Sequence, residues 1–135
     1  MNAQGFRQAV VSAIETWRLA NEPALPAFYQ NASLPDEEGV GPIWLDQYTR
    51  FVDAAYVTVG SRPRGRQRGS VVVNVYVRKG EGTAEQDRLL DSLTEVLRTL
   101  RVSGAVFGMP MRTPGTDFFG WAKEGVLMPF RFDSA

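Results

Sequence analysis

Residues 66–100 have the sequence RQRGSVVVNVYVRKGEGTAEQDRLLDSLTEVLRTL, and this stretch decides the fold. Its first part places a valine at every second position from 71 to 77, which is the alternation of a β-strand with one face in a core. The opposite face of this strand is mixed and carries Ser70, Val72, Asn74, Tyr76 and Arg78. The pattern indicates a sheet that buries one face and turns the other towards solvent, a loop or a partner.

The second part of the stretch predicts an amphipathic helix. Gly80 and Gly82 end the strand. Thr83, with Gln86 three residues later, matches a capping box, in which both side chains satisfy backbone donors of the first helical turn. The helix then has a single apolar stripe, formed by Leu89, Leu93, Val96, Leu97 and Leu100. Acidic residues near its start and arginines near its end agree with the helix dipole.

The composition restricts the kinds of function that the chain can have. Its 135 residues are 44% hydrophobic and 22% charged with a net charge of +0, and we expect a single domain over residues 1–135. The sequence has no cysteine and no histidine, which excludes disulfides, cysteine-bound metals and the Ser-His-Asp arrangement. No segment approaches the roughly 20 apolar residues of a membrane span. We therefore expect synthesis in the cytoplasm, no membrane partner and no cofactor.

The residues before residue 66 predict a helix, a long connection, two strands and a loop. In chain order these elements are a helix over about residues 5–20, a Pro- and Gly-rich connection over 23–42, strands over 43–52 and 54–59, and a loop over 61–69. The helix ends before Pro23 because proline disfavours the helical conformation of the preceding residue. A connection as long as the one over 23–42 is usually functional. In the loop, glycine and proline are expected to forbid a continuous strand ladder.

The residues after residue 100 predict two further strands. A short strand is expected to start at 105–107, a loop covers 110–115, and a closing strand runs over 122–132. Pro129 indicates that the closing strand lies at a sheet edge or contains a bulge. Each helix has only one apolar stripe and must therefore pack on the sheet or on the other helix. The expected fold is α+β, a mostly antiparallel sheet of about five to six strands with two helices on one face, in the order α-β-β-β-α-β-β.

Several segments between Ala27 and Phe132 form a pattern that is known from one family. They are Phe28-Tyr29-Gln30-Asn31, Gly41-Pro42-Ile43-Trp44-Leu45, a Gly- and Arg-rich loop that closes on Arg68-Gly69, Val71–Val77, Gly80-Glu81-Gly82-Thr83-Ala84 before Asp87–Leu97, and Val126-Leu127-Met128-Pro129-Phe130. Together they resemble the tail terminator, or tail completion, proteins of long-tailed bacteriophages and prophages. The chain departs from the family pattern at Phe51-Val52-Asp53, which lengthens the first hairpin and leaves the register of the second strand open.

The resemblance implies a structural virion protein and not an enzyme. Such a protein would assemble in the host bacterial cytoplasm into a hexameric ring, cap the end of the tail tube, stop its growth and offer a joining surface to the head connector. The implied partners are other copies of the chain, the tail tube protein and the head-tail connector protein, with transient contact to DNA in the ring bore. Two alternatives stay open: another phage neck or head-completion protein, and a small nucleic-acid-binding module. Enzyme function is disfavoured because Asp46, Asp53 and Asp91 have no catalytic motif spacing.

Two charged runs are candidate contact residues. Arg62, Arg64, Arg66 and Arg68 form one run, and Asp36, Glu37 and Glu38 form the other. The arginines suit a solvated loop, phosphate contacts in the ring bore, or carboxylates of a neighbouring subunit. The acidic run suits a solvated loop better than a cation site, because adjacent acids point in different directions. In a ring, the acidic run of one subunit could meet the arginines of the next.

The mixed face of the central strand is a further candidate contact. Val72, Asn74 and Tyr76 could be covered there by a sister subunit. Trp17 is expected in the core. Trp44 and Trp121 suit the core and a contact surface about equally, because each faces the less apolar side of its strand.

Overall fold

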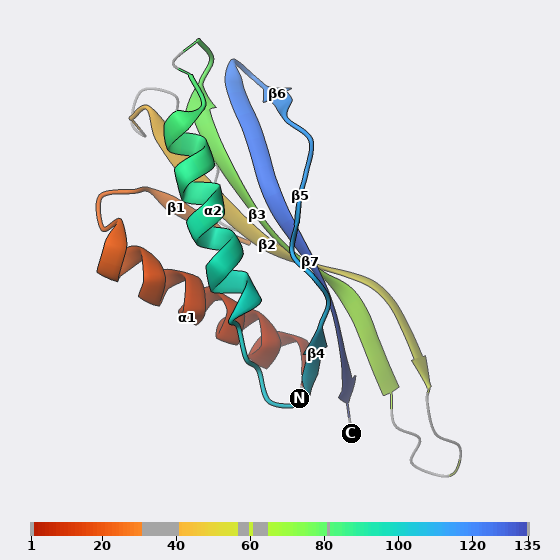
Figure 1. Cartoon of the computed structure of the whole chain (residues 1–135). Helices are drawn as coiled ribbons and strands as arrows, with labels where there is room; N and C mark the ends of the chain where they lie inside the picture. Colours follow the sequence, from red (N-terminus) through yellow and green to blue (C-terminus); the bar gives the residue numbers. More distant parts are fainter. Residues whose placement is uncertain (1, 31–40, 57–59, 61–64, 81, 135) are drawn as a thin grey trace.

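A computed structural model describes residues 2–30, 41–56, 60, 65–80 and 82–134 of the chain (Figure 1). Two helices, α1 (Ala3–Asn21) and α2 (Ala84–Arg98), lie on one face of a sheet. The strands are β1 (Ala27–Tyr29), β2 (Ile43–Tyr56), β3 (Gly65–Arg78), β4 (Ala105–Phe107), β5 (Met111–Arg112), β6 (Thr116–Phe118) and β7 (Trp121–Ser134). The α+β class with both helices on one face is confirmed. The described residues form seven strands instead of five to six, in the order α-β-β-β-α-β-β-β-β.

The sheet is built around three long strands. Its order is β1-β2-β3-β7-β4, and the short strands β5 and β6 also pair with β7. Strand β3 pairs along its whole length with β7, from Gly65 opposite Ser134 to Arg78 opposite Trp121. All of these pairs are antiparallel except the one between β1 and β2. The far edge of β7 is therefore covered in succession by three short strands.

The core lies between the helices and the sheet, where the sequence predicted it. The alternate valines of β3, from Val71 to Val77, are almost fully buried, and so are Leu89, Leu93 and Leu97 of α2. Helix α1 contributes Phe6, whose ring packs 4.2 Å from that of Phe130 and 5.2 Å from that of Phe132, between ring centroids. Trp17 is half-buried against this core, as expected.

The two strands predicted over 43–52 and 54–59 are wrong for the described residues, because residues 43–56 form one strand. Phe51 lies opposite Gly69 and Asp53 lies opposite Arg68, so Val52 is an extra residue in β2. This is a β-bulge, which inserts one unpaired residue and shifts the side-chain alternation by one position. In the sequence, this break in the alternation has the same pattern as a boundary between two strands, and two strands were therefore predicted.

The loop predicted over 61–69 is also wrong in part, because β3 begins at Gly65. Residues 65–69 pair with β2 on one side and with β7 on the other. At Gly69 a Cβ atom would lie 2.0 Å from the carbonyl oxygen of Arg50 and 2.9 Å from the ring of Phe130. The glycine therefore allows two backbones to approach each other beside the bulge, and it does not end the ladder.

The predicted capping box at the start of α2 does not form. Thr83 makes no side-chain capping hydrogen bond. The buried Gln86 side chain instead donates from Nε2 to the carbonyl oxygens of Val75, at 2.9 Å, and Ala122, at 3.0 Å. Burial decides this outcome, because the amide of a buried glutamine must find hydrogen-bond partners and the sheet carbonyls beside it provide them. Gln86 thus ties α2 to β3 and β7.

Pro129 does not mark an edge strand, because β7 lies between β3 and the short strands. Its carbonyl oxygen accepts a hydrogen bond of 2.8 Å from the backbone N–H of Gly108. The nitrogen of a strand residue points to the same side as its carbonyl group, so the Pro129 nitrogen faces the gap between β4 and β5. The missing N–H therefore costs no ladder bond. Strands β1, β5 and β6 are too short to show a period. The first lies in the predicted connection over 23–42, the second lies in the predicted loop over 110–115, and no element was predicted for the residues of β6.

Candidate functional site

The helices leave one face of the sheet free, and this helix-free face is the candidate contact surface (Figure 1). Its residues alternate with those of the core along the three long strands. They are Trp44, Asp46, Tyr48 and Arg50 of β2, Arg68, Ser70, Val72, Asn74, Tyr76 and Arg78 of β3, and Trp121, Lys123, Leu127, Pro129 and Arg131 of β7. Aromatic side chains gather at one end of this face and arginines at the other.

The aromatic end forms a second small core. The Trp44 and Tyr76 rings stack with centroids 3.8 Å apart and an interplanar angle of 5°, and Trp121 contacts Trp44 edge-on. Phe28 and Phe118 pack against these three buried side chains. Trp44 and Trp121 therefore belong to the interior of the subunit. The guanidinium of Arg78 lies 4.7 Å from the centroid of the Trp121 ring, a cation–π contact.

A buried polar row follows the aromatic end. The Asp46 carboxylate accepts hydrogen bonds from Asn74 Nδ2, at 3.0 Å, and from the Tyr76 hydroxyl, at 2.9 Å. Val72, Asn74 and Tyr76 are only 5%, 3% and 2% exposed in the single chain. A Cβ atom at Gly125 would lie 2.3 Å from Asn74 Oδ1, so glycine is required where β7 passes this side chain. A partner on this face would therefore touch little of Val72, Asn74 and Tyr76 and would contact mainly their more exposed neighbours.

The arginine end of the helix-free face is open. Arg68, Arg131 and Val106 lie in one cross-strand row of β3, β7 and β4. Arg68 approaches Asp53 at 3.8 Å, with both side chains more than half exposed. In the described part of the chain, Arg50 and Arg131 have no carboxylate within salt-bridge distance. A hollow of about 330 Å³ opens here, lined by Arg68, Val106, Phe107, Gly108, Pro129, Phe130 and Arg131.

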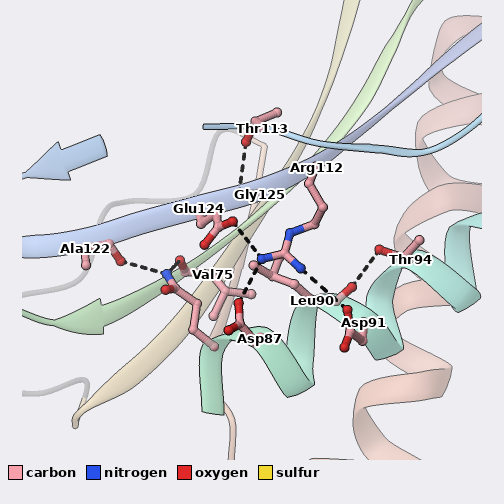
Figure 2. A network of polar contacts seen from close by, with 11 residues as sticks. Val75, Asp87, Leu90, Asp91, Thr94, Arg112, Thr113, Ala122, Glu124 and Gly125 are labelled. Atoms are coloured by element: carbon pink, nitrogen blue, oxygen red, sulfur yellow. Dashed lines mark hydrogen bonds and ion pairs between the residues drawn. The ribbon is translucent and has the colours of Figure 1, made fainter. Parts of the chain in front are cut away.

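A cluster of charges on the helix side of the sheet was missed from the sequence (Figure 2). Arg112 of β5 contacts Asp87 Oδ1 at 3.0 Å, Glu124 Oε1 at 2.7 Å and Asp91 Oδ1 at 3.5 Å. It therefore connects a two-residue strand to α2 and to β7. Next to it, the Thr113 backbone N–H donates to the Gly125 carbonyl at 2.9 Å. The four-residue spacing of Asp87 and Asp91, which puts both on one helix face, was the only sequence signal for this cluster.

Comparisons with known proteins identify the family. A family model described as phage tail terminator protein matches residues 6–118. The chain belongs to the phage tail terminator family. A solved structure with a TM-score of 0.73 covers 100% of this chain and 98% of its own, at 17% sequence identity, and shows that the fold is shared. Among the curated proteins no sequence matches this chain.

As a member of the tail terminator family, the protein is a structural component of phage tails, and the resemblance seen in the sequence is confirmed. The candidate residues of this tail terminator fall into two groups. Arg62, Arg64 and the acidic run Asp36, Glu37 and Glu38 lie outside the described residues. Arg66 and Arg68 lie in β3, where the Arg66 Nε donates to Asp133 Oδ1 at 2.8 Å. Contact roles for all of these residues stay predictions.

Across the residues that the structure places, no three acidic side chains come together in a way that could hold a metal ion. None of the helices there has the length and apolar character of a membrane span.

Burial of Asp46 in this tail terminator predicts a pH dependence. Burial raises the pKa of its carboxyl group, against the opposing effects of Asn74, Tyr76 and Lys123. The folded chain therefore binds the Asp46 carboxyl proton more tightly than the unfolded chain. Protonation of Asp46 stabilises the fold at low pH, and this stabilisation is lost as the pH rises through the raised pKa. We expect the free energy of unfolding of Asp46→Asn, relative to wild type, to increase in urea titrations as the pH rises from about 4, the unfolded-state pKa of aspartate. Asp91→Asn, at an exposed aspartate, is the control, and a pH-independent difference for Asp46→Asn would contradict the expectation.

The Arg112 cluster of the tail terminator predicts a moderate stability effect. Arg112→Ala removes the shared cation and leaves three carboxylates on α2 and β7 to repel one another. We expect the free energy of unfolding to fall by about 1 kcal/mol, because these groups are partly exposed and screened by solvent. Added salt should recover part of the loss. Arg98→Ala, which removes a single exposed ion pair with Glu95, should change stability much less than Arg112→Ala. Equal effects of the two substitutions in chemical denaturation would show that the Arg112 cluster stabilises the fold no more than one exposed ion pair does.

Proposed function

We propose that this protein assembles into a hexameric ring at the end of the tail tube, stops tube growth and offers the surface that joins the head connector. The match to the tail terminator family over residues 6–118 is the observation that carries this proposal. Each chain would contribute one structural domain and no bond-making chemistry. The other phage alternative, a neck or head-completion protein, predicts a different location in the particle.

The distribution of charge and apolar surface supports a ring. A ring is closed by heterologous contacts, in which each subunit presents two different surfaces to its two neighbours. The helix-free face presents Arg50 and Arg131 beside exposed apolar side chains, which is the composition of protein interfaces. On the other side of the molecule, Asp87, Asp91 and Glu95 are exposed on successive turns of α2. The chain thus combines two unlike surfaces with a net charge of +0.

Electron microscopy of particles made without this protein tests the proposal. Deletion of the coding sequence from the phage or prophage should give tail tubes of uncontrolled length that carry no heads. Supply of the wild-type chain from a plasmid should restore a uniform length. Tubes of normal length after deletion would refute the role in termination. If normal tails and empty or leaking heads were found instead, the head-completion alternative would replace it.

A transient contact with DNA in the ring bore is the second part of the proposal. It is favoured by Arg50 and Arg131, which have no carboxylate partner in the described part of the chain. Arginines that neutralise phosphates release counterions, so binding to duplex DNA should weaken steeply as salt increases. We expect Arg50→Ala with Arg131→Ala to reduce the slope of this salt dependence. Binding that does not change with salt, or a double variant that binds like wild type, would remove DNA as a partner of this face.

A further inference from the structure

The turn between β6 and β7 presents an unusual phenylalanine. Phe119 is 88% exposed and has a φ of 47°, in the left-handed region. It is followed by Gly120, with a φ of 88°, and Phe118 pairs with Trp121 across this two-residue turn. Turns of this kind prefer Asn-Gly or Gly-Gly, and a bulky residue with positive φ is a true outlier. Within the described residues its ring meets the Phe118 ring edge-on, with centroids 5.0 Å apart, and otherwise stays exposed. A strained backbone that presents an aromatic ring to solvent points to a contact with another molecule.

The hollow on the helix-free face has the chemistry to bind an aromatic ring. Its floor is apolar and includes Pro129 and Val106, which is 55% exposed. Arg68 and Arg131 also line it, and guanidinium groups can lie against the faces of an aromatic ring. The hollow of about 330 Å³ is open to solvent and is thus accessible to a side chain from outside.

Phe119 and the hollow lie far apart on one molecule. Phe119 is next to the start of β7 at Trp121, whereas Arg131 and Pro129 lie near its other end (Figure 1). The ten residues of extended chain from Trp121 to Arg131 span roughly 33 Å, so Phe119 cannot fill the hollow of its own chain. A projection at one end of a strand and a matching hollow at the other form a heterologous pair of surfaces, which closes into a ring when the rotation between copies allows it.

We propose that Phe119 of one copy inserts into the hollow between Arg68 and Arg131 of the next copy, so that this contact repeats around the ring. The proposal rests on the proposed ring, because it identifies which surfaces meet there. Asp117, two residues before Phe119, pairs with Lys79 at 2.8 Å, so the two charges beside the projection balance each other.

Cross-linking in assembled tails tests the contact. The chain has no cysteine, so Thr116→Cys beside the projection and Met109→Cys beside the hollow, both at exposed positions, introduce unique thiols while Phe119 and the residues that line the hollow stay unchanged. Tails that carry the double variant and are treated with a short bismaleimide should give a ladder of covalent oligomers that ends at the ring. Each single variant should give no ladder. Tails that contain the double variant but give no ladder would overturn the contact, whereas tails that lack the protein altogether would overturn the proposed function.

Removal of the ring of Phe119 gives a second test. Glycine tolerates a positive φ, so Phe119→Gly should fold with a melting temperature equal to or above that of wild type. In a phage that supplies only this variant, we expect tube lengths as uncontrolled as in the deletion. Leu19→Ala, which removes another exposed apolar side chain, on α1, should give tubes of normal length. Normal tube lengths with Phe119→Gly would refute the inference and leave tail termination intact. Long tubes without a cross-linked ladder would also refute it, since Phe119 would then contact a different tail protein.

Discussion

Phe6→Ala is expected to lower the free energy of unfolding by about 3–5 kcal/mol, the usual cost of deleting a fully buried phenylalanine. The Phe6 ring is completely inaccessible and lies at the centre of an aromatic group. Its ring contacts those of Phe51, Phe107, Phe130 and Phe132, with centroids between 4.2 and 6.5 Å apart. These rings come from β2, β4 and β7, so one side chain of α1 holds three strands together. Urea unfolding followed by circular dichroism measures the change.

The same helix offers a matched control for this prediction. Leu19 also lies on α1, but its side chain is 60% exposed. Leu19→Ala should therefore change the free energy of unfolding by less than about 0.5 kcal/mol. If Phe6→Ala cost no more than Leu19→Ala, the aromatic group would contribute no packing energy, and α1 would be held mainly by other contacts.

Gly69→Ala is expected to destabilise the sheet by about 3 kcal/mol or more, the size of effect that backbone strain at a special position produces. The new Cβ would lie 2.0 Å from the backbone oxygen of Arg50, which cannot rotate away as the end of a side chain could. Strands β2 and β3 would have to separate beside the bulge at Val52, and the pairing of the arginine end would loosen. Hydrogen exchange of the amides of residues 65–69 locates the damage, and urea unfolding measures its size.

Gly115→Ala is the control for steric crowding. A Cβ atom there would meet nothing closer than the Lys123 carbonyl oxygen at 3.9 Å, which is an ordinary contact. We expect this variant to stay within about 0.5 kcal/mol of wild type. A Gly69→Ala protein of wild-type stability would mean that β2 and β3 can move apart at the bulge without cost.

The long elements could be predicted because each shows its pattern locally. The alternate valines of β3 and the leucine stripe of α2 report which side of each element is buried, and both sets of residues lie in the core. Gln86 shows where such reasoning stops. Its position after Thr83 favours a cap, but its partners Val75 and Ala122 lie 11 and 36 residues away. Partners at that separation leave no spacing signal in the sequence.

The candidate site was predicted less well than the fold. The mixed face of β3 was correctly placed on the side without helices, yet Val72, Asn74 and Tyr76 proved almost inaccessible there. The exposed residues of that face come from strands on either side, such as Arg131 of β7 and Val106 of β4. They become neighbours only because the strands pair in a particular register. The alternation of residues within one strand does not reveal that register.

The sequence by itself determined that the protein has two helices on one face of a largely antiparallel sheet, and it pointed to the tail terminator family. The helices and strands could be predicted because burial of one face imposes a period on residues that are close in the chain, whereas the family was indicated by the resemblance of particular segments. Only the tertiary structure decided that β2 is one bulged strand, that Arg112 joins three carboxylates, and that a hollow opens between Arg68 and Arg131. These features depend on register between strands and helices distant in the chain, and that register is set by packing of the whole molecule.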